Sequence, residues 1–414
     1  MIENIALQKG KPISSKRPLV LDENVFHNLI SPKSFQRFEQ EYWEQKPLVI
    51  KRKGSDFYKN LFSLDLVDKV LDLSKPTGGS IRVVKDQKPM LKQKYENGDG
   101  NLGLNQIYAA YADGYTIVIN EIDRFWSPIK SFCRFFSTEL SHHSVANMYL
   151  TPRNEVALAP HYDTHDVYVL QIHGKKHWNL YDPVNITPTM NSHQPIFNEK
   201  DLYNQQQVTL EAGDFMYMPR GIPHHAYTSD KSSLHLTIGV YPPQWSDLLI
   251  NSIKAKSYNV LDLRQSLPLG YLKDDQAKDQ VLSRAKELIK SHTAELNLNQ
   301  GVFMLSEELR TQFILPADGH FENLDILEEI NCNTVLEKRT HSFSYVLNKG
   351  GEARILYPGN IVKGPYQVSS AFEFISNTQS FAVYELPIEL DEHKITIAKK
   401  LVRGGLLKMK QEFN

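Results

Sequence analysis

The chain has 414 residues, and its 47 Lys and Arg against 48 Asp and Glu give a formal net charge of −1. This balance excludes a global electric field that would draw in nucleic acid or an anionic membrane. The length allows two or three domains. The sequence has only two cysteines, which lie far apart, and this favours the reducing cytoplasm. It has no apolar stretch long enough to span a membrane, so no membrane partner is expected.

The N-terminal third predicts a mixed arrangement of helices and strands. Within residues 31–52, Phe35, Phe38 and Tyr42 recur at helical spacing after a Ser-Pro start, and a short strand follows Pro47. Between about residues 80 and 150, β-rich segments such as SIRVVK and YTIVIN alternate with helical ones such as GLNQIYAAYADG. This alternation indicates an α/β region.

Short strands separated by turns dominate from SVANMYLTP to LHLTIGVYPPQW, which predicts a β-barrel or jelly roll. Within this region, DVYVLQIHGKKHWNLY predicts two β-runs joined by a turn at Gly174 and Lys175. Two further strands are expected in GDFMYMP and SLHLTIGVY.

After Trp245 the composition favours helices. The segment DDQAKDQVLSRAKELIKSHTAEL places apolar residues on one helical face behind aspartates that can cap its start. In the last hundred residues a loop is expected, followed by a helix from about Asp391 to Arg403 that ends at Gly404 and Gly405.

A metal site is suggested by His161 and Asp163, because side chains two residues apart on an extended strand point to the same face. Two histidines and a carboxylate on one face of an octahedron suit iron(II) and leave three positions open. A lone His-x-Asp triplet is more often surface polarity than a metal site. A third ligand must therefore come from elsewhere.

The candidate third ligand is His224, in GDFMYMPRGIPHHAYT. This segment fits G-x5-P-x-G-x2-H, which resembles the second cupin motif, and its two turns hold the imidazole on a rigid strand. His225 is a rival that strand alternation turns to the opposite face. A fourth ligand at His165 would close the open positions, and His173 and His177 are expected to face solvent.

Lys176 shares a strand face with Trp178 and Leu180, so its ammonium is expected to point into the barrel. A buried cation requires an anion, and Asp163 is assigned to the metal. If Lys176 is buried, the anion is expected to be a carboxylate of a cosubstrate. If Lys176 instead lies in a surface turn, its ammonium is solvated and needs no anion.

Together these residues resemble the JmjC-type, cupin-fold oxygenases that depend on iron(II) and 2-oxoglutarate, in particular the ribosomal oxygenases that hydroxylate histidine or arginine in ribosomal proteins. The resemblance runs from FEQEYWEQKPLVIKR through HYDTHDVYVLQIHGKKHWNLYDP and DFMYMPRGIPHHAY to KITIAKKLVRGGLL. It implies an α+β fold, with a double-stranded β-helix (the cupin or JmjC jelly roll) in residues 1–245, a helical dimerisation domain in 246–310 and a winged-helix-like domain in 311–414.

The resemblance also implies roles for individual residues. His161, Asp163 and His224 match the iron ligands, and Lys176 matches the residue that pairs with the distal carboxylate of 2-oxoglutarate. Further matches are Asn147 and Thr237 beside the cosubstrate and Tyr149 in a catalytic position. The expected enzyme uses Fe(II), 2-oxoglutarate and O2 as a homodimer, and its substrate is a protein or peptide, possibly ribosomal.

The sequence leaves the substrate open. Gly239 stands where the histidine hydroxylases carry serine, so histidine and arginine are both possible targets. Alternatives are a hydroxylase of a small molecule or peptide natural product, a demethylase or tRNA-base hydroxylase of the JmjC type, another cupin enzyme, and a non-catalytic module. The acidic run ELDEH at the last helix argues against DNA binding.

Overall fold

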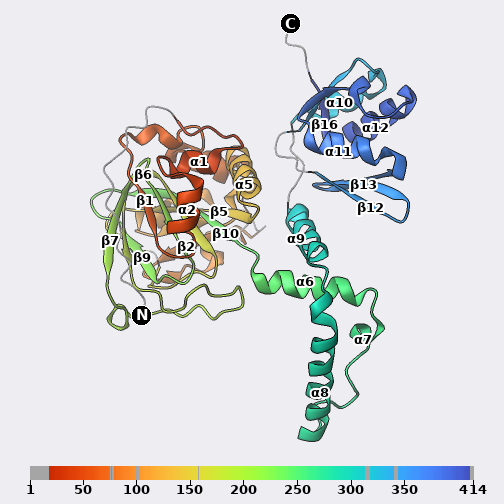
Figure 1. The fold of residues 1–414 in the computed structure, drawn as a ribbon. Coiled ribbons are helices and arrows are strands. Elements are labelled where there is room, and N and C mark those ends of the chain that lie inside the picture. Colours follow the sequence, from red (N-terminus) through yellow and green to blue (C-terminus); the bar gives the residue numbers. More distant parts are fainter. Residues whose placement is uncertain are drawn as a thin grey trace. The chain divides into compact units, whose positions relative to one another are not determined.

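The computed structural model describes residues 18–410 apart from 75, 77–78, 99–101, 157, 313–317 and 340–343. The chain divides into two compact units between Pro242 and Pro243 (Figure 1). Each unit has its own apolar core. Among the described residues, no helix is both long and apolar enough to cross a membrane.

The first unit combines helices with a large sheet. Its helices are α1 (Val25–Ile30), α2 (Phe35–Glu41), α3 (Leu64–Lys69), α4 (Leu104–Ala112) and α5 (Ser127–Leu140). Its strands are β1 (Leu48–Ile50), β2 (Ile81–Lys85), β3 (Lys88–Pro89), β4 (Thr116–Ile119), β5 (His143–Thr151), β6 (Asp166–Leu180), β7 (Gln206–Glu211), β8 (Phe215–Met218), β9 (His224–Tyr227) and β10 (Ser233–Tyr241). The helix and strand expected within residues 31–52 are present as α2 and β1. The N-cap of α2 is Ser34, whose side chain accepts a hydrogen bond from the backbone N–H of Arg37.

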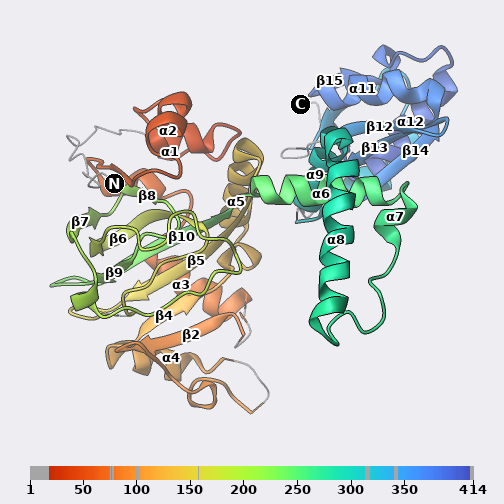
Figure 2. The same ribbon diagram turned by 60° about the horizontal axis from the view of Figure 1, so that its bottom comes forward.

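The strands form one antiparallel sheet in the order β1-β8-β6-β10-β5-β4-β2-β3, and β7 and β9 pair with the second half of β6. Figure 2 shows β6, β10, β5, β4 and β2 following one another across this sheet. The mixed α+β character expected from the sequence is therefore confirmed.

The two faces of the sheet have different environments, because successive side chains on a strand point to opposite sides. On one face, Tyr168 of β6 packs edge-on against Phe136 of α5, which in turn packs against Phe26 of α1. On the other face, Val167 and Val169 join a separate apolar cluster that includes residues of β7 and β8. The helices thus cover one face, and the opposite face lines an interior.

The expected turn at Gly174 and Lys175 is wrong, because β6 runs without a break through both residues. Gly174 has a φ of +68°, and a Cβ there would lie 1.8 Å from the carbonyl oxygen of Ser232. Because glycine has no side chain, β6 can pass close to the backbone of Ser232 and continue as one strand. Its first half pairs with β8 and β10 and its second half with β7 and β9, so β6 belongs to both sets of strands.

The second unit begins with helices and ends in a mixed fold. Its helices are α6 (Trp245–Ser257), α7 (Leu261–Arg264), α8 (Asp275–His292), α9 (Leu298–Gln312), α10 (His320–Asp325), α11 (Ser369–Asn377) and α12 (Asp391–Arg403). Its strands are β11 (Val335–Lys338), β12 (Tyr345–Lys349), β13 (Glu352–Tyr357), β14 (Asn360–Pro365), β15 (Ser380–Ala382) and β16 (Leu407–Met409).

Two predicted helices of this unit are present. The side chain of Asp274 caps α8 by accepting from the N–H of Ala277, and α12 has the expected bounds. The segment before α12, expected to be a loop, contains β15, whose pairing with β11 the sequence pattern did not indicate. None of the residues of α8 is buried within the single chain, so its apolar face is open.

Candidate metal and cosubstrate site

The three predicted metal ligands lie together on the interior side of the first unit. His161, which precedes β6, and His224, which opens β9, form an antiparallel bridge with backbone hydrogen bonds of 3.1 and 2.8 Å. Directly opposed residues in such a bridge point to the same side, and the two rings lie 4.7 Å apart. With Asp163, they offer ligand atoms that all lie within 4.8 Å of one another.

Hydrogen bonds fix the orientation of both imidazoles. The Nδ1 atom of His161 lies 2.7 Å from the carbonyl oxygen of Ala159, and that of His224 lies 3.0 Å from the carbonyl oxygen of Ile222. These bonds leave Nε2 of each ring free to bind a metal. Metal-binding histidines commonly use their other ring nitrogen for a hydrogen bond of this kind. The backbone N–H of Gly221 also bonds to the carbonyl oxygen of Asp163, which ties the turn before β9 to this segment.

The electrostatics of the cluster suit a cation. Burial, together with the nearby His161, lowers the pKa of His224 to about 4, so this imidazole is neutral at pH 7 and its lone pair is available. Burial alone would raise the pKa of Asp163, but the surrounding histidines lower it below its ordinary value. Two imidazoles and one carboxylate form a donor set that fits Fe(II).

Lys176 lies inside the first unit, as the strand alternation predicted. Its side chain is 3 % exposed, and its ammonium donates a hydrogen bond of 2.7 Å to the hydroxyl of Thr151. Within the described ranges, no carboxylate lies within ion-pair distance of it. Burial lowers the pKa of Lys176 to about 7. The site therefore holds a titratable amine without an anion, and an incoming carboxylate would stabilise its charged form.

The other three predicted site residues come from two paired strands. Thr237 of β10 lies opposite Asn147 of β5, and His235 lies opposite Tyr149. The side-chain oxygen of Asn147 accepts from the backbone N–H of Glu121 at 2.9 Å. Burial raises the pKa of Tyr149, so its phenol stays protonated and can donate a hydrogen bond.

All seven predicted site residues border one cavity of about 190 Å³. They are His161, Asp163, His224, Lys176, Asn147, Tyr149 and Thr237. The cavity thus joins the candidate metal ligands to the buried ammonium, and one small molecule inside it could contact both.

Three further histidines border the same cavity, and the sequence interpretation gave a role to none of them. His235 is buried, stacks on Tyr149 at 4.9 Å, and its Nδ1 has no hydrogen-bond partner. His235 lies two residues before Thr237 on the same strand, so strand alternation could have placed it on the cavity side from the sequence. His225 contacts Asn179 and Glu199 and stays outside the cluster of ligand atoms. His165 faces the cavity as well.

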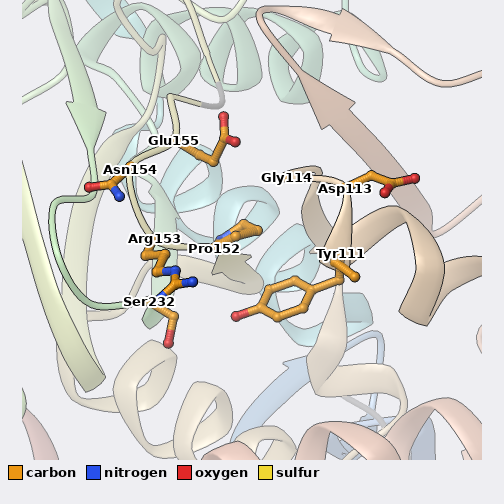
Figure 3. A pocket seen from close by; sticks show the side chains of 9 residues that line it. Tyr111, Asp113, Gly114, Pro152, Arg153, Asn154, Glu155 and Ser232 are labelled. Atoms are coloured by element: carbon orange, nitrogen blue, oxygen red, sulfur yellow. The ribbon is translucent and has the colours of Figure 1, made fainter.

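A larger hollow of about 630 Å³ on the same unit contains none of the predicted site residues. It lies between the end of α4 and the segment after β5, and Figure 3 shows the phenol of Tyr111 directed toward Arg153 and Ser232. Its walls carry no histidine and only two carboxylates, on Asp113 and Glu155. The smaller cavity is therefore the one with the chemistry of a metal site.

Comparison with known proteins gives a consistent family. Residues 121–248 match the model of the JmjC domain. A bifunctional lysine-specific demethylase and histidyl-hydroxylase NO66 of Dictyostelium discoideum is 27 % identical over 430 residues, which covers 93 % of this chain and 82 % of that protein. Ribosomal oxygenase 1 of Danio rerio is 25 % identical over 444 residues, covering 92 % of this chain and 79 % of the relative.

Solved structures agree at the level of the fold. The Escherichia coli ribosomal oxygenase YcfD matches with a TM-score of 0.53 at 16 % identity, covering 91 % of this chain and 98 % of that one. A structure of YcfD in complex with cobalt and 2-oxoglutarate matches with a TM-score of 0.50. The domain match shows a JmjC domain in residues 121–248, and the relatives along most of the chain indicate a 2-oxoglutarate-dependent oxygenase that is similar to the ribosomal oxygenases.

Proposed function

We propose that this protein is an Fe(II)- and 2-oxoglutarate-dependent oxygenase that hydroxylates a histidine or arginine side chain of a ribosomal protein. The observation that carries the proposal is the single cavity in which His161, Asp163 and His224 converge while the unpaired ammonium of Lys176 lies inside the same walls. A metal cluster alone suits many reactions. A metal cluster beside a buried cation without an anion calls for a dicarboxylate cosubstrate.

In this proposal His161, Asp163 and His224 hold the iron through two Nε2 atoms and one carboxylate oxygen. When bound, the iron and its cosubstrate supply the oxidising power that inserts one oxygen atom of O2 into an unactivated C–H bond. Lys176 binds the distal carboxylate of 2-oxoglutarate, with Thr151 holding the ammonium in place. Asn147 and Thr237 orient the cosubstrate, and the protonated phenol of Tyr149 donates a hydrogen bond on its catalytic side.

We also propose that the ten-stranded sheet is a double-stranded β-helix. In its support, the long β6 pairs with β8 and β10 along one half and with β7 and β9 along the other, and the interior face carries the cavity. Residues 246–310 then serve as a dimerisation domain, because α8 has an apolar face that the single chain leaves uncovered. Residues 311–414 form a winged-helix-like domain in which α11, α12 and β13 share one core.

A cytoplasmic location fits the two cysteines, Cys133 and Cys332, which are both free thiols and are suited to a reducing compartment. A lysine demethylase is the second candidate function, because a relative that matches 93 % of this chain carries that activity in its name as well as histidyl hydroxylation. Both reactions use the same metal and cosubstrate, and they differ in the C–H bond that is hydroxylated: a side-chain carbon of histidine or arginine in one, and an N-methyl group of lysine, which then leaves as formaldehyde, in the other.

Mass spectrometry of ribosomal proteins from the host, with and without the gene, tests the proposal. We expect one histidine or arginine residue to lose a mass of about 16 Da, the mass of one oxygen atom, when the gene is deleted. Purified protein with trimethyl-lysine peptides provides the competing assay, in which formaldehyde release would favour the demethylase. An unchanged ribosomal proteome would reject the ribosomal substrate.

A further inference from the structure

The cavity has an inner and an outer end, which the pairing of β5 with β10 defines. From the Lys176 end outward, opposed residues on the interior face are, in order, Tyr149 and His235, Asn147 and Thr237, Val145 and Gly239, and His143 and Tyr241. The first two pairs carry polar side chains that border the cavity. In the third pair, Gly239 has no side chain to contribute.

The place of a side chain at Gly239 is taken by His165. A Cβ atom at Gly239 would lie 2.7 Å from Cδ2 and 2.9 Å from Nε2 of His165. The imidazole also stacks on Tyr241, with ring centroids 4.9 Å apart and an interplanar angle of 27°. The glycine backbone and the tyrosine ring therefore fix the position of this imidazole on the cavity wall.

His165 is one of the histidines that lower the pKa of Asp163, but it is not one of the three candidate metal ligands. Its nitrogens lie outside the cluster of ligand atoms formed by His161, Asp163 and His224. Among the described residues, neither ring nitrogen of His165 has a hydrogen-bond partner, although the residue is half-buried. An imidazole held in place on two sides, with both ring nitrogens free, is arranged to bind a polar group in the cavity.

We propose that His165 is a specificity-determining residue, which hydrogen-bonds to the nitrogen-bearing planar side chain that the enzyme oxidises, an imidazole or a guanidinium. Gly239 is the residue that makes room for it. The inference rests on the proposed function for the position of the metal, but it does not depend on the substrate being ribosomal. An aliphatic target would leave the polar edge of His165 without a partner, so it would bind more weakly.

Ligand-observed NMR on the protein loaded with Zn(II) and 2-oxoglutarate tests this without turnover. The probes are N-acetyl-histidine amide, N-acetyl-arginine amide and N-acetyl-leucine amide. We expect one of the two nitrogen-bearing probes to bind on the order of fivefold to tenfold more tightly than the leucine probe, the value of about one hydrogen bond. The probe that is preferred identifies the target as imidazole or guanidinium.

Variants assign the preference to His165. His165→Phe keeps a stacking ring but has no nitrogen, so the ratio of affinities for the preferred probe and the leucine probe should fall close to one. His165→Gln restores a hydrogen-bond donor and acceptor and should recover most of this ratio. Gly239→Ala should reduce the preference because its methyl group displaces the imidazole. His173→Phe, at an exposed position of β6, is the matched control and should behave as wild type.

The outcomes separate this inference from the proposed function. Equal binding of all three probes to wild type, or an unchanged preference in His165→Phe, would overturn the role of His165. Failure of the wild type to bind Zn(II) would instead contradict the metal site itself. A clear preference combined with no hydroxylation of ribosomal proteins would keep the role of His165 and reject only the ribosomal substrate.

Discussion

The guanidinium of Arg220 donates a hydrogen bond of 3.0 Å to the carboxylate of Asp166, and both side chains are buried. A second nitrogen of the same guanidinium donates to Glu44, and the backbone N–H of Arg220 donates to the other oxygen of Asp166. Asp166 opens β6 three residues after Asp163, and Arg220 lies in the turn that precedes His224. The pair therefore joins the two chain segments that carry the candidate metal ligands.

Removing the arginine should destabilise the first unit. Arg220→Met leaves the carboxylate of Asp166 buried without its cation, so the free energy of unfolding in urea should fall by about 3 kcal/mol. Arg37→Met is the control, because its ion pair with Glu41 is largely exposed, and it should cost less than about 1 kcal/mol. Equal losses in the two variants would contradict the role assigned to the buried pair.

Neighbouring histidines distinguish the metal ligand from its rival. His224→Ala should weaken binding of Co(II), measured by calorimetry, by more than about 100-fold, which exceeds the usual loss of an outer partner of a ligand. His225→Ala is the matched control and should keep most of the affinity, because His225 contacts Asn179 and Glu199 instead. A harmless His224→Ala would show that the assignment is wrong.

The sequence predicted the local geometry of the site because strand alternation decides which side chains share a face. His161 and Asp163, and Lys176 with Trp178, are pairs of this kind, and each was placed on the interior side where the structure has it. The Gly-rich turns around GDFMYMPRGIPHH likewise fixed His224 on a short strand.

Contacts between distant segments were not predictable from such patterns. Gly174 was taken for a turn because glycine marks turns, whereas here the approach of the Ser232 backbone requires it within a continuous strand. His165 was set aside as a fourth ligand, and it does lie outside the ligand cluster, but nothing local shows that Gly239, seventy-four positions on, leaves space for its ring. Both contacts involve a glycine that admits a neighbour from elsewhere in the chain.

The open face of α8 gives a prediction about assembly. Leu282 and Ile289 are 56 % and 59 % exposed in the single chain, and they lie on the same side of the helix. The double variant Leu282→Glu with Ile289→Glu should convert a dimer into a monomer in light scattering, because charges there oppose burial. Gln280→Glu with Ser291→Glu, at exposed positions on the opposite side of α8, is the control. A wild-type monomer would contradict the proposed homodimer.

Lys176 should make stability depend on pH in the absence of cosubstrate. Its pKa in the folded protein is about 7, below the ordinary value of 10.5 that it regains on unfolding. Between these values the unfolded chain binds more protons than the folded one, so the contribution of Lys176 to the free energy of unfolding rises with pH from about 7 to 10.5. Lys176→Met should remove this rise, and Lys175→Met, at a more exposed neighbouring position, should leave it in place.

The same titration should govern binding of 2-oxoglutarate. The dicarboxylate favours the charged form of Lys176, so above pH 7 binding requires the uptake of a proton. Apparent affinity should then fall as pH rises, by up to about tenfold per pH unit, until the pKa of the bound state is reached. Calorimetry of the Zn(II)-loaded protein at pH 8 in two buffers of different ionisation enthalpy measures the uptake directly. We expect close to one proton for wild type and for Lys175→Met, and none for Lys176→Met, whose affinity should be low at every pH. Equal heats in both buffers for the wild type would mean that the anion does not bind at Lys176.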